Sequence, residues 1–271
     1  MTTFSDTPET APPILVEQRG ALTAITLNRP QKLNALTEAL LIQLADALKA
    51  AQQDQTVRAV LLTGAGKAFC AGQDLADRDP RKHAEPFDLE AIQTRLFHPV
   101  VRLMREMEKP VVVAVSGVAA GAGAAIALAA DIILAADDAR FILSFAKVGL
   151  SVDAGAGFAL VQALGPARAR GLMLTGGTLT GREAVEAGLA FKSVPSANLT
   201  DEIDALTTAL AEGPTAAYGA IKKAVQAAHT SDFETYLAEE ARLQGLAGKT
   251  SDYREGVLAF LEKRQATFRG R

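Results

Sequence analysis

Two glycine-rich turns are the first candidates for chemistry in this chain of 271 residues. The turn at residues 69–75 follows the β-like run 58–63, and the turn at 116–123 follows the β-like run 111–115. Glycine lets a turn bring backbone N–H groups close to a ligand, and two such donors aimed at one point make an oxyanion hole. This arrangement would stabilise negative charge on an acyl carbonyl oxygen. Either turn taken alone is better explained as an ordinary strand-to-helix connection, so the hypothesis depends on the pair.

The elements that must position these turns can be predicted from hydrophobic periodicity. Up to about residue 195 predicted strands alternate with predicted helices, and only helical patterns follow. The expected strands are 14–19, 21–27, 58–63, 111–115, 131–135, 140–143 and 189–194. The expected helices are 37–53, a stretch ending near 108 with a kink or break at Pro99, 124–130, 167–175, 182–187, 200–212, 216–228, 232–246 and 252–268. This order indicates an α/β core over 13–198 and an α-helical C-terminal region over 199–271, after a flexible tail over 1–12.

Composition argues against several classes of function. Net charge is −3 without a basic stripe, which disfavours nucleic-acid binding. No signal peptide is visible, and glycines and Asp131 interrupt the apolar residues 111–135, so no membrane span is expected. The single cysteine, Cys70, fits a reducing cytoplasm, and its apolar neighbours favour a packing role over a nucleophilic one. The histidines show no metal-ligand spacing, so no metal is expected.

Tyr218 and Lys222 match the catalytic pair of short-chain dehydrogenases in their spacing. The serine that should precede the tyrosine is missing, and the glycine turn at 117–123 follows several strands instead of the first. We therefore predict that both residues lie on one face of an ordinary helix.

Four segments together resemble the crotonase (enoyl-CoA hydratase/isomerase) superfamily. They are 27–36 (LNRPQKLNAL), 69–75 (FCAGQDL), 116–131 (SGVAAGAGAAIALAAD) and 255–264 (EGVLAFLEKR). The resemblance implies a core of ββα turns wound as a spiral, with C-terminal helices that make a homotrimer or a dimer of trimers. It also implies an acyl-CoA thioester as substrate, with coenzyme A as part of that substrate and no further cofactor.

The resemblance also implies roles for individual residues. The backbone N–H groups of Gln73 and Ala122 would form the oxyanion hole, and the helix after Ala122 would favour negative charge through its dipole. The residues implied in substrate and coenzyme A binding are Arg29, Lys32, Leu33, Ala35, Ala71, Gly72, Asp74, Leu75, Gly121, Phe260 and Lys263. The last two would reach the nucleotide of their own or of a neighbouring subunit. Without the resemblance, they would be typical of an amphipathic helix with an exposed lysine.

The choice of reaction depends on the acidic residues around the turns. Hydratases of this family activate water with two glutamates, and the equivalent positions here hold Ala125 and Phe145, which cannot transfer a proton. Asp153 matches a loop in which some isomerases and dehalogenases of the family carry a catalytic aspartate. An aspartate there is also typical of a helix N-cap. The catalytic interpretation predicts one buried carboxylate with a raised pKa, which moves a proton from C2 to C4 of a thioester.

Within the superfamily, the motifs are most similar to the ring 1,2-epoxyphenylacetyl-CoA isomerases of phenylacetate degradation. The chain differs from them at Ser151, Val152 and residues 154–157, and the charged loop 76–88 has no readable pattern. Three hypotheses follow. The first is an acyl-CoA isomerase acting on a ring epoxide or on a Δ3/Δ2-enoyl group. The second is another enzyme of the superfamily, such as a hydratase or hydrolase, and the third is a catalytically weak acyl-CoA-binding subunit.

Overall fold

The computed structural model describes residues 11–82 and 85–271, so most of the expected tail over 1–12 lies outside the described residues. The described strands form two sheets. The larger sheet has the order β1 (Ile14–Arg19), β2 (Leu22–Leu27), β3 (Ala59–Gly64), β5 (Val111–Val115), β7 (Ile132–Ala136) and β10 (Lys192–Val194). The smaller sheet has the order β4 (Ala68–Cys70), β6 (Val118–Ala120), β8 (Arg140–Ile142) and β9 (Thr178–Thr180).

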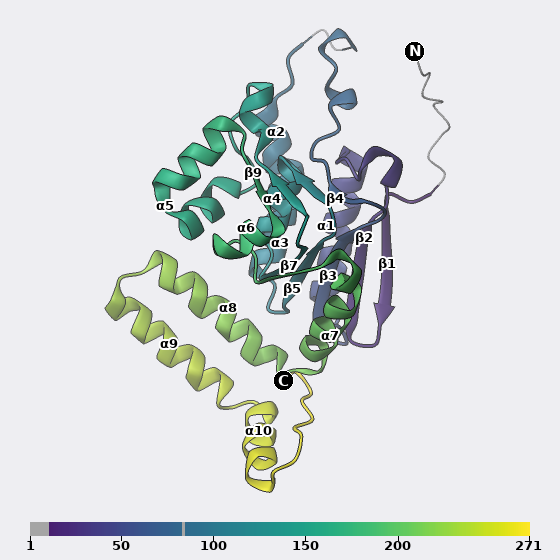
Figure 1. The fold of residues 1–271 in the computed structure, drawn as a ribbon. Coiled ribbons are helices and arrows are strands. Elements are labelled where there is room, and N and C mark those ends of the chain that lie inside the picture. Colours follow the sequence, from purple (N-terminus) through teal and green to yellow (C-terminus); the bar gives the residue numbers. More distant parts are fainter. Residues whose placement is uncertain (1–10, 83–84) are drawn as a thin grey trace.

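The strands follow one another as a spiral of ββα turns (Figure 1). The pairs β3–β4, β5–β6 and β7–β8 each give one strand to the larger sheet and one to the smaller sheet before a helix returns the chain. Neighbouring turns pair in parallel, β3 with β5, β5 with β7, and β4 with β6. Every residue of β5 is buried, which explains its unbroken apolar run. The predicted α/β core is confirmed.

Helix α1 (Glu38–Gln53) shows how local sequence sets an element. The Thr37 hydroxyl accepts a hydrogen bond from the backbone N–H of Leu40, as expected of an N-cap. Its buried stripe includes Leu41, Leu44 and Leu48, spaced to lie on one face.

The helix predicted to kink or break at Pro99 continues through that residue. It consists of α2 (Leu89–Ile92), a π-helical turn (Gln93–Phe97) and α3 (His98–Glu106). Proline lacks an N–H and its ring crowds the carbonyl four residues earlier. The wider π turn, which ends at Phe97, lies just ahead of Pro99 and gives this part of the helix a looser geometry.

Three predicted helix boundaries are wrong. Helix α5 (Ala156–Thr175) begins well before 167, because Ala156 and Leu160 pack into the core, while Gly165 (φ 71°) bends the helix before Pro166. Helix α4 (Ala122–Leu128) begins two residues before 124. Helix α10 (Ser251–Glu262) ends before 268, because Lys263 adopts the left-handed conformation that caps the helix, and the chain then turns back.

In that return, the Asp252 carboxylate accepts hydrogen bonds from the backbone N–H groups of Arg269 and Gly270, both at 2.7 Å.

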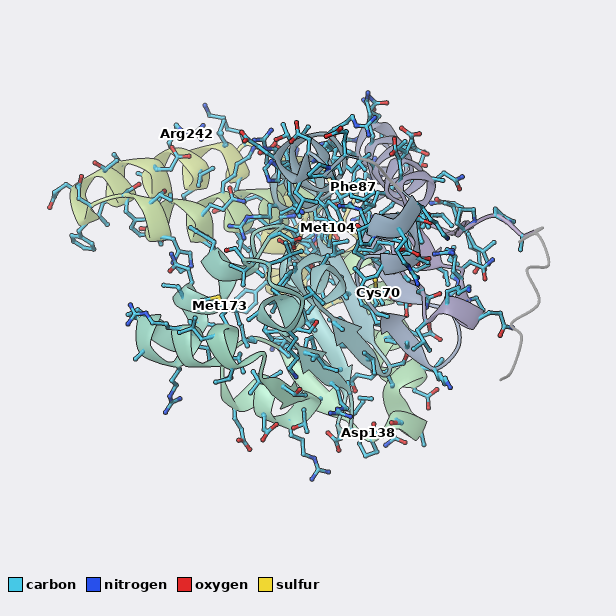
Figure 2. The ribbon with its side chains drawn as sticks, turned by 90° about the horizontal axis from the view of Figure 1, so that it is seen from above. Cys70, Phe87, Met104, Asp138, Met173 and Arg242 are labelled. Carbon is cyan, nitrogen blue, oxygen red and sulfur yellow. The ribbon has the colours of Figure 1, made fainter. Side chains whose placement is uncertain are left out.

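The remaining helices are α6 (Gly181–Glu186), α7 (Leu199–Glu212), α8 (Thr215–Thr230) and α9 (Phe233–Ala247). Helix α7 packs on β2, β3 and β7, whereas α8 and α9 pair with each other and extend from the core (Figure 1). Figure 2 looks down on the molecule and shows Arg242 on this projecting pair, away from Cys70 in the core. Among the described residues, no helix is both long and apolar enough to cross a membrane.

Candidate active site

One cavity of about 620 Å³ brings together both glycine turns and the predicted catalytic aspartate. Its lining contains Gln73, Ala122 and Asp153. The other predicted site residues in the lining are Ala71, Gly72, Leu75 and Gly121. The cavity thus joins segments that lie far apart in the sequence, as an active site requires.

The first turn offers the Gln73 amide as a free donor. Leu36 N–H donates to the Gly72 carbonyl at 2.7 Å, and Asp74 N–H donates to the Leu36 carbonyl at 3.0 Å. These two bonds use the Gly72 carbonyl and the Asp74 N–H, the backbone groups on either side of Gln73. They form an isolated β-bridge between Gln73 and Leu36 and leave the Gln73 N–H itself unused. Across residues 11–82 and 85–271, no acceptor meets the Gln73 N–H.

The second turn offers the Ala122 amide. Ala122 is the first residue of α4, and a first-turn N–H has no partner within its own helix. Gly121 precedes it with a φ of 49° and donates its own N–H to the Ile142 carbonyl at 2.9 Å. The described part of the chain gives the Ala122 N–H no acceptor.

Two glycines allow these turns to pack backbone against backbone. A Cβ at Gly72 (φ 91°) would lie 2.7 Å from the Ala120 oxygen and 3.5 Å from the Ala122 nitrogen. A Cβ at Gly123 would lie 2.5 Å from the Cys70 oxygen. Only glycine fits at either position, and this close packing holds the two turns together where Gln73 and Ala122 line one cavity.

Cys70 has the packing role predicted for it. Its thiol is fully buried, and this burial raises the pKa to about 12. The sulfur contacts the Asn34 carbonyl at 3.2 Å and accepts from the Gly72 N–H at 3.4 Å. A thiol so rarely ionised is a poor nucleophile, so Cys70 supports the first turn instead.

Asp153 lies just before α5, and the N-cap interpretation of its side chain is wrong. Gly155 is the N-cap residue of α5 and no side chain caps that end. The Oδ2 atom of Asp153 accepts a hydrogen bond from Gln93 Nε2 at 2.8 Å. Its Oδ1 atom is buried, and nothing in the described chain bonds to it. The carboxyl group is therefore left for a purpose other than helix capping.

The surroundings of Asp153 change its acidity. Burial raises the pKa from the ordinary 3.8 to about 6, while the Gln93 hydrogen bond and the positive charge of Arg78 oppose this rise. A carboxyl group that ionises near pH 6 is a better match for a proton that it must both accept and return near neutral pH.

Among the lining residues that sequence reasoning missed are Arg78, Phe87, Glu90 and Gln93. They come from the charged loop predicted over 76–88 and from the helix after it. The Arg78 guanidinium lies 5.3 Å from the centre of the Phe87 ring, within cation–π range. The sequence gives no spacing signal for them, because only the folded chain brings this loop over Asp153.

Five predicted site residues lie beside the first turn but outside the cavity lining. They are Arg29, Lys32, Leu33, Ala35 and Asp74. Arg29 is buried, and its Nη1 donates to the Ala35 carbonyl at 2.6 Å and to Asp74 Oδ2 at 3.0 Å. Lys32 is exposed. The geometry makes Arg29 and Asp74 braces between two turns, with Lys32 facing solvent nearby.

Phe260 and Lys263 are not brought to the cavity within one chain. Phe260 is 84% exposed, and Lys263 ends α10 in the left-handed region. Figure 1 shows α10 at the opposite end of the molecule from α2, which lines the cavity.

Neither position expected to hold a hydratase glutamate carries an acid in the folded chain. Phe145 lines the cavity, and Ala125 is buried in α4 outside the lining.

Lys222 lies on helix α8, as predicted for the Tyr218–Lys222 pair. Its Nζ lies 2.6 Å from Asp131 Oδ2 and donates to the Lys109 carbonyl at 3.1 Å.

Comparisons with known proteins agree with this geometry. A family model described as Enoyl-CoA hydratase/isomerase matches residues 17–271. A 1,2-epoxyphenylacetyl-CoA isomerase from Escherichia coli K12 is 44% identical, over 94% of this chain and 97% of the relative. A protein named "Probable enoyl-CoA hydratase" from Rhodobacter capsulatus is 43% identical, over 95% of this chain and 98% of the relative. The crystal structure of an enoyl-CoA hydratase from Bacillus anthracis superposes with a TM-score of 0.86 at 30% identity, covering 96% of this chain and 100% of that one.

Proposed function

Since the chain belongs to the enoyl-CoA hydratase/isomerase family, we propose that it is an acyl-CoA isomerase whose proton-transfer group is Asp153. The observation that carries this proposal is the shared cavity. Asp153 lies in it with the Gln73 and Ala122 amides, whereas Ala125 and Phe145 stand where the family's hydratases hold acids.

The proposed steps need only groups of this chain and of the substrate. The Asp153 carboxylate removes a proton from C2 of a 3-enoyl thioester, and the electrons of that C–H bond form an enolate. The Gln73 and Ala122 N–H groups stabilise the enolate oxygen, each by roughly 3–4 kcal/mol when well aimed. The neutral Asp153 then returns its proton to C4, which leaves the double bond between C2 and C3. No cofactor takes part, because the thioester itself stabilises the carbanion.

The acyl group that we propose is an aromatic ring epoxide or a Δ3-enoyl chain. The relative from Escherichia coli is named for the ring epoxide. The lining includes the apolar side chains Leu75, Phe87 and Val148, which would contact a ring or a chain.

The test is turnover of a panel of acyl-CoA thioesters by the wild type and by Asp153→Asn. We expect isomerisation of the ring epoxide or of a 3-enoyl-CoA, with a loss of at least about 100-fold in kcat in the variant. Binding of the thioester, measured by calorimetry, should persist in both proteins. Equal turnover by both would refute the role of Asp153, and binding without turnover of any thioester would support the acyl-CoA-binding subunit.

Hydration of a 2-enoyl-CoA is the second candidate, and one observation favours it. Glu90 is an exposed carboxylate in the same cavity, so two acidic groups are available to hold a water. Fast hydration that is lost in Glu90→Gln would support this candidate. Fast hydration that persists in Asp153→Asn would remove Asp153 from the chemistry.

We also propose that the C-terminal helices assemble a homotrimer, or a dimer of trimers. The exposed apolar side chains on α10, including Tyr253 (58% exposed), Phe260 (84%) and Leu261 (69%), support a covered surface there. In such an assembly Phe260 and Lys263 would reach the coenzyme A of a neighbouring subunit. Light scattering of the wild type and of Phe260→Glu tests this, and a monomeric wild type would refute it.

A further inference from the structure

Two buried atoms beside the cavity have unmet hydrogen-bonding capacity. Within the described residues, the buried side-chain oxygens or nitrogens without a partner are Gln93 Oε1, Ser116 Oγ and Asp153 Oδ1. Two of the three belong to one contacting pair, since Gln93 Nε2 donates to Asp153 Oδ2 at 2.8 Å. Solvent does not reach either orphaned oxygen. Buried polar atoms normally have partners, so this pair needs an explanation.

The chemistry of the two groups supplies one. A carboxamide carries a donor and an acceptor on one planar carbon, and so does a protonated carboxyl group. When the amide N–H donates to Oδ2, the atoms left over are the amide Oε1, an acceptor, and Oδ1, which becomes a donor once protonated. A single proton on Oδ1, shared with the amide oxygen, would satisfy both orphaned atoms at once.

We propose that Gln93 is a positioning residue that binds Asp153 in both of its protonation states. Its Nε2–H donates to the carboxylate, and its Oε1 accepts from Oδ1–H of the neutral acid. This inference rests on the proposed function, in which Asp153 alternates between the two states during each turnover. Proton transfer between substrate carbon and carboxylate then leaves the side chain in place, because its partner suits the state before and the state after.

The charged groups around the pair cannot replace this role. Arg78, from the turn Leu75–Arg78, and Glu90, from α2, line the same cavity. Arg78 stabilises only the ionised form of Asp153. Glu38 and Asp77 act on Arg78 and not directly on the aspartate. Gln93 alone among these groups offers both a donor and an acceptor, and it opens the π-helical turn Gln93–Phe97, a feature common at functional sites.

Infrared titration of the protein without substrate tests the contact directly. The carboxylic acid C=O band that is absent in Asp153→Asn identifies the neutral acid. We expect this band to appear in the wild type as pH falls through about 6, and to move to higher frequency in Gln93→Met. Methionine has a similar size but no amide. Thr94→Val is the matched control, because Thr94 is the next residue and is exposed, and its hydroxyl donates to the Glu90 carbonyl at 3.0 Å.

Kinetics on a 3-enoyl-CoA provides a second readout. In Gln93→Met we expect kcat to fall by about three- to tenfold with little change in KM, because the lost bond is made to Asp153. We also expect the acidic limb of the rate profile to move up by about one pH unit or less, because a bond to the ionised form is the stronger of the two that are lost. Thr94→Val should match the wild type in each measurement.

A second variant guards against misfolding of the first. In Gln93→Glu two carboxyl groups would share one proton, so the pair should titrate in two steps with the upper pKa well above that of the wild type. Unchanged Asp153 bands in both Gln93 variants would overturn the inference even if the enzyme isomerises 3-enoyl-CoA. The expected band shifts in a protein without isomerase activity would support the pair and refute the proposed function instead.

Discussion

Replacing Asp153 by asparagine should stabilise the folded protein at neutral and alkaline pH. Burial raises the pKa of Asp153 from 3.8 to about 6, so the folded state prefers the neutral acid. Below pH 3.8 the neutral acid does not lower the free energy of unfolding. As pH rises from 3.8 through about 6, the free energy of unfolding falls, because the unfolded chain ionises more readily than the folded one. A rise of about two units corresponds to a cost of about 3 kcal/mol above pH 7, and to about half of that at pH 5.

Urea unfolding at pH 5 and pH 8, at one protein concentration, measures this cost. Asparagine is uncharged and keeps an oxygen for the Gln93 Nε2 donor, so the variant should gain more stability at pH 8 than at pH 5, by about 1–2 kcal/mol. The control is Asp46→Asn, at an exposed position on α1, which should show no such difference. An Asp153→Asn gain that is equal at both pH values would refute the raised pKa and with it the argument from burial.

Three further predictions concern activity. The kcat/KM for isomerisation should fall about tenfold per pH unit below about 6, because Asp153 must be ionised to accept the proton, and a limb near pH 4 would contradict this. Gln73→Ala should change kcat by no more than about threefold. The variant loses the side-chain bond to the Leu36 carbonyl at 3.0 Å but keeps the backbone donor. A loss as large as that of Asp153→Asn would show that the side chain matters. Gly123→Ala should lower kcat by about 100-fold or more, because its Cβ would meet the Cys70 oxygen at 2.5 Å and push the turns apart. The control is Gly171→Ala, which should leave kcat unchanged, because a Cβ there meets no described atom within 4 Å.

The free energy that the fold loses by burying the Asp153 carboxylate distinguishes a catalytic aspartate from a helix cap. A carboxyl group used only for helix capping would be solvated or bonded to backbone N–H groups, and its pKa would fall. Asp153 has the opposite environment, with one oxygen bonded to an amide side chain and the other enclosed without a partner. Such an environment destabilises the fold and favours proton exchange near neutral pH, which is the balance expected of a catalytic group.

Local sequence determined the parts of the site that depend on backbone. The strand before the second turn, Val111–Val115, is apolar on every residue, and the glycines at 72 and 123 are required by contacts of the turns themselves. Because the oxyanion donors that we propose are backbone amides, their positions follow from the turn and do not depend on side-chain chemistry. The late predicted start of α5 shows where local sequence misleads, since glycines near 155 and 165 are typical of a loop, whereas Leu160 packs into the core and the stretch is helical.

Tertiary structure alone decided what surrounds the carboxylate. Gln93 bonds to Asp153 across 60 residues of sequence, and Arg78 reaches it from a loop that has no periodic pattern. The pKa of Asp153 is set by how much solvent this packing removes, and burial belongs to the whole fold and not to any segment. The sequence by itself thus determined the two glycine turns that hold the proposed oxyanion hole, because turn geometry is local. The folded chain decided how readily Asp153 accepts a proton, because solvation and long-range contacts depend on the whole fold.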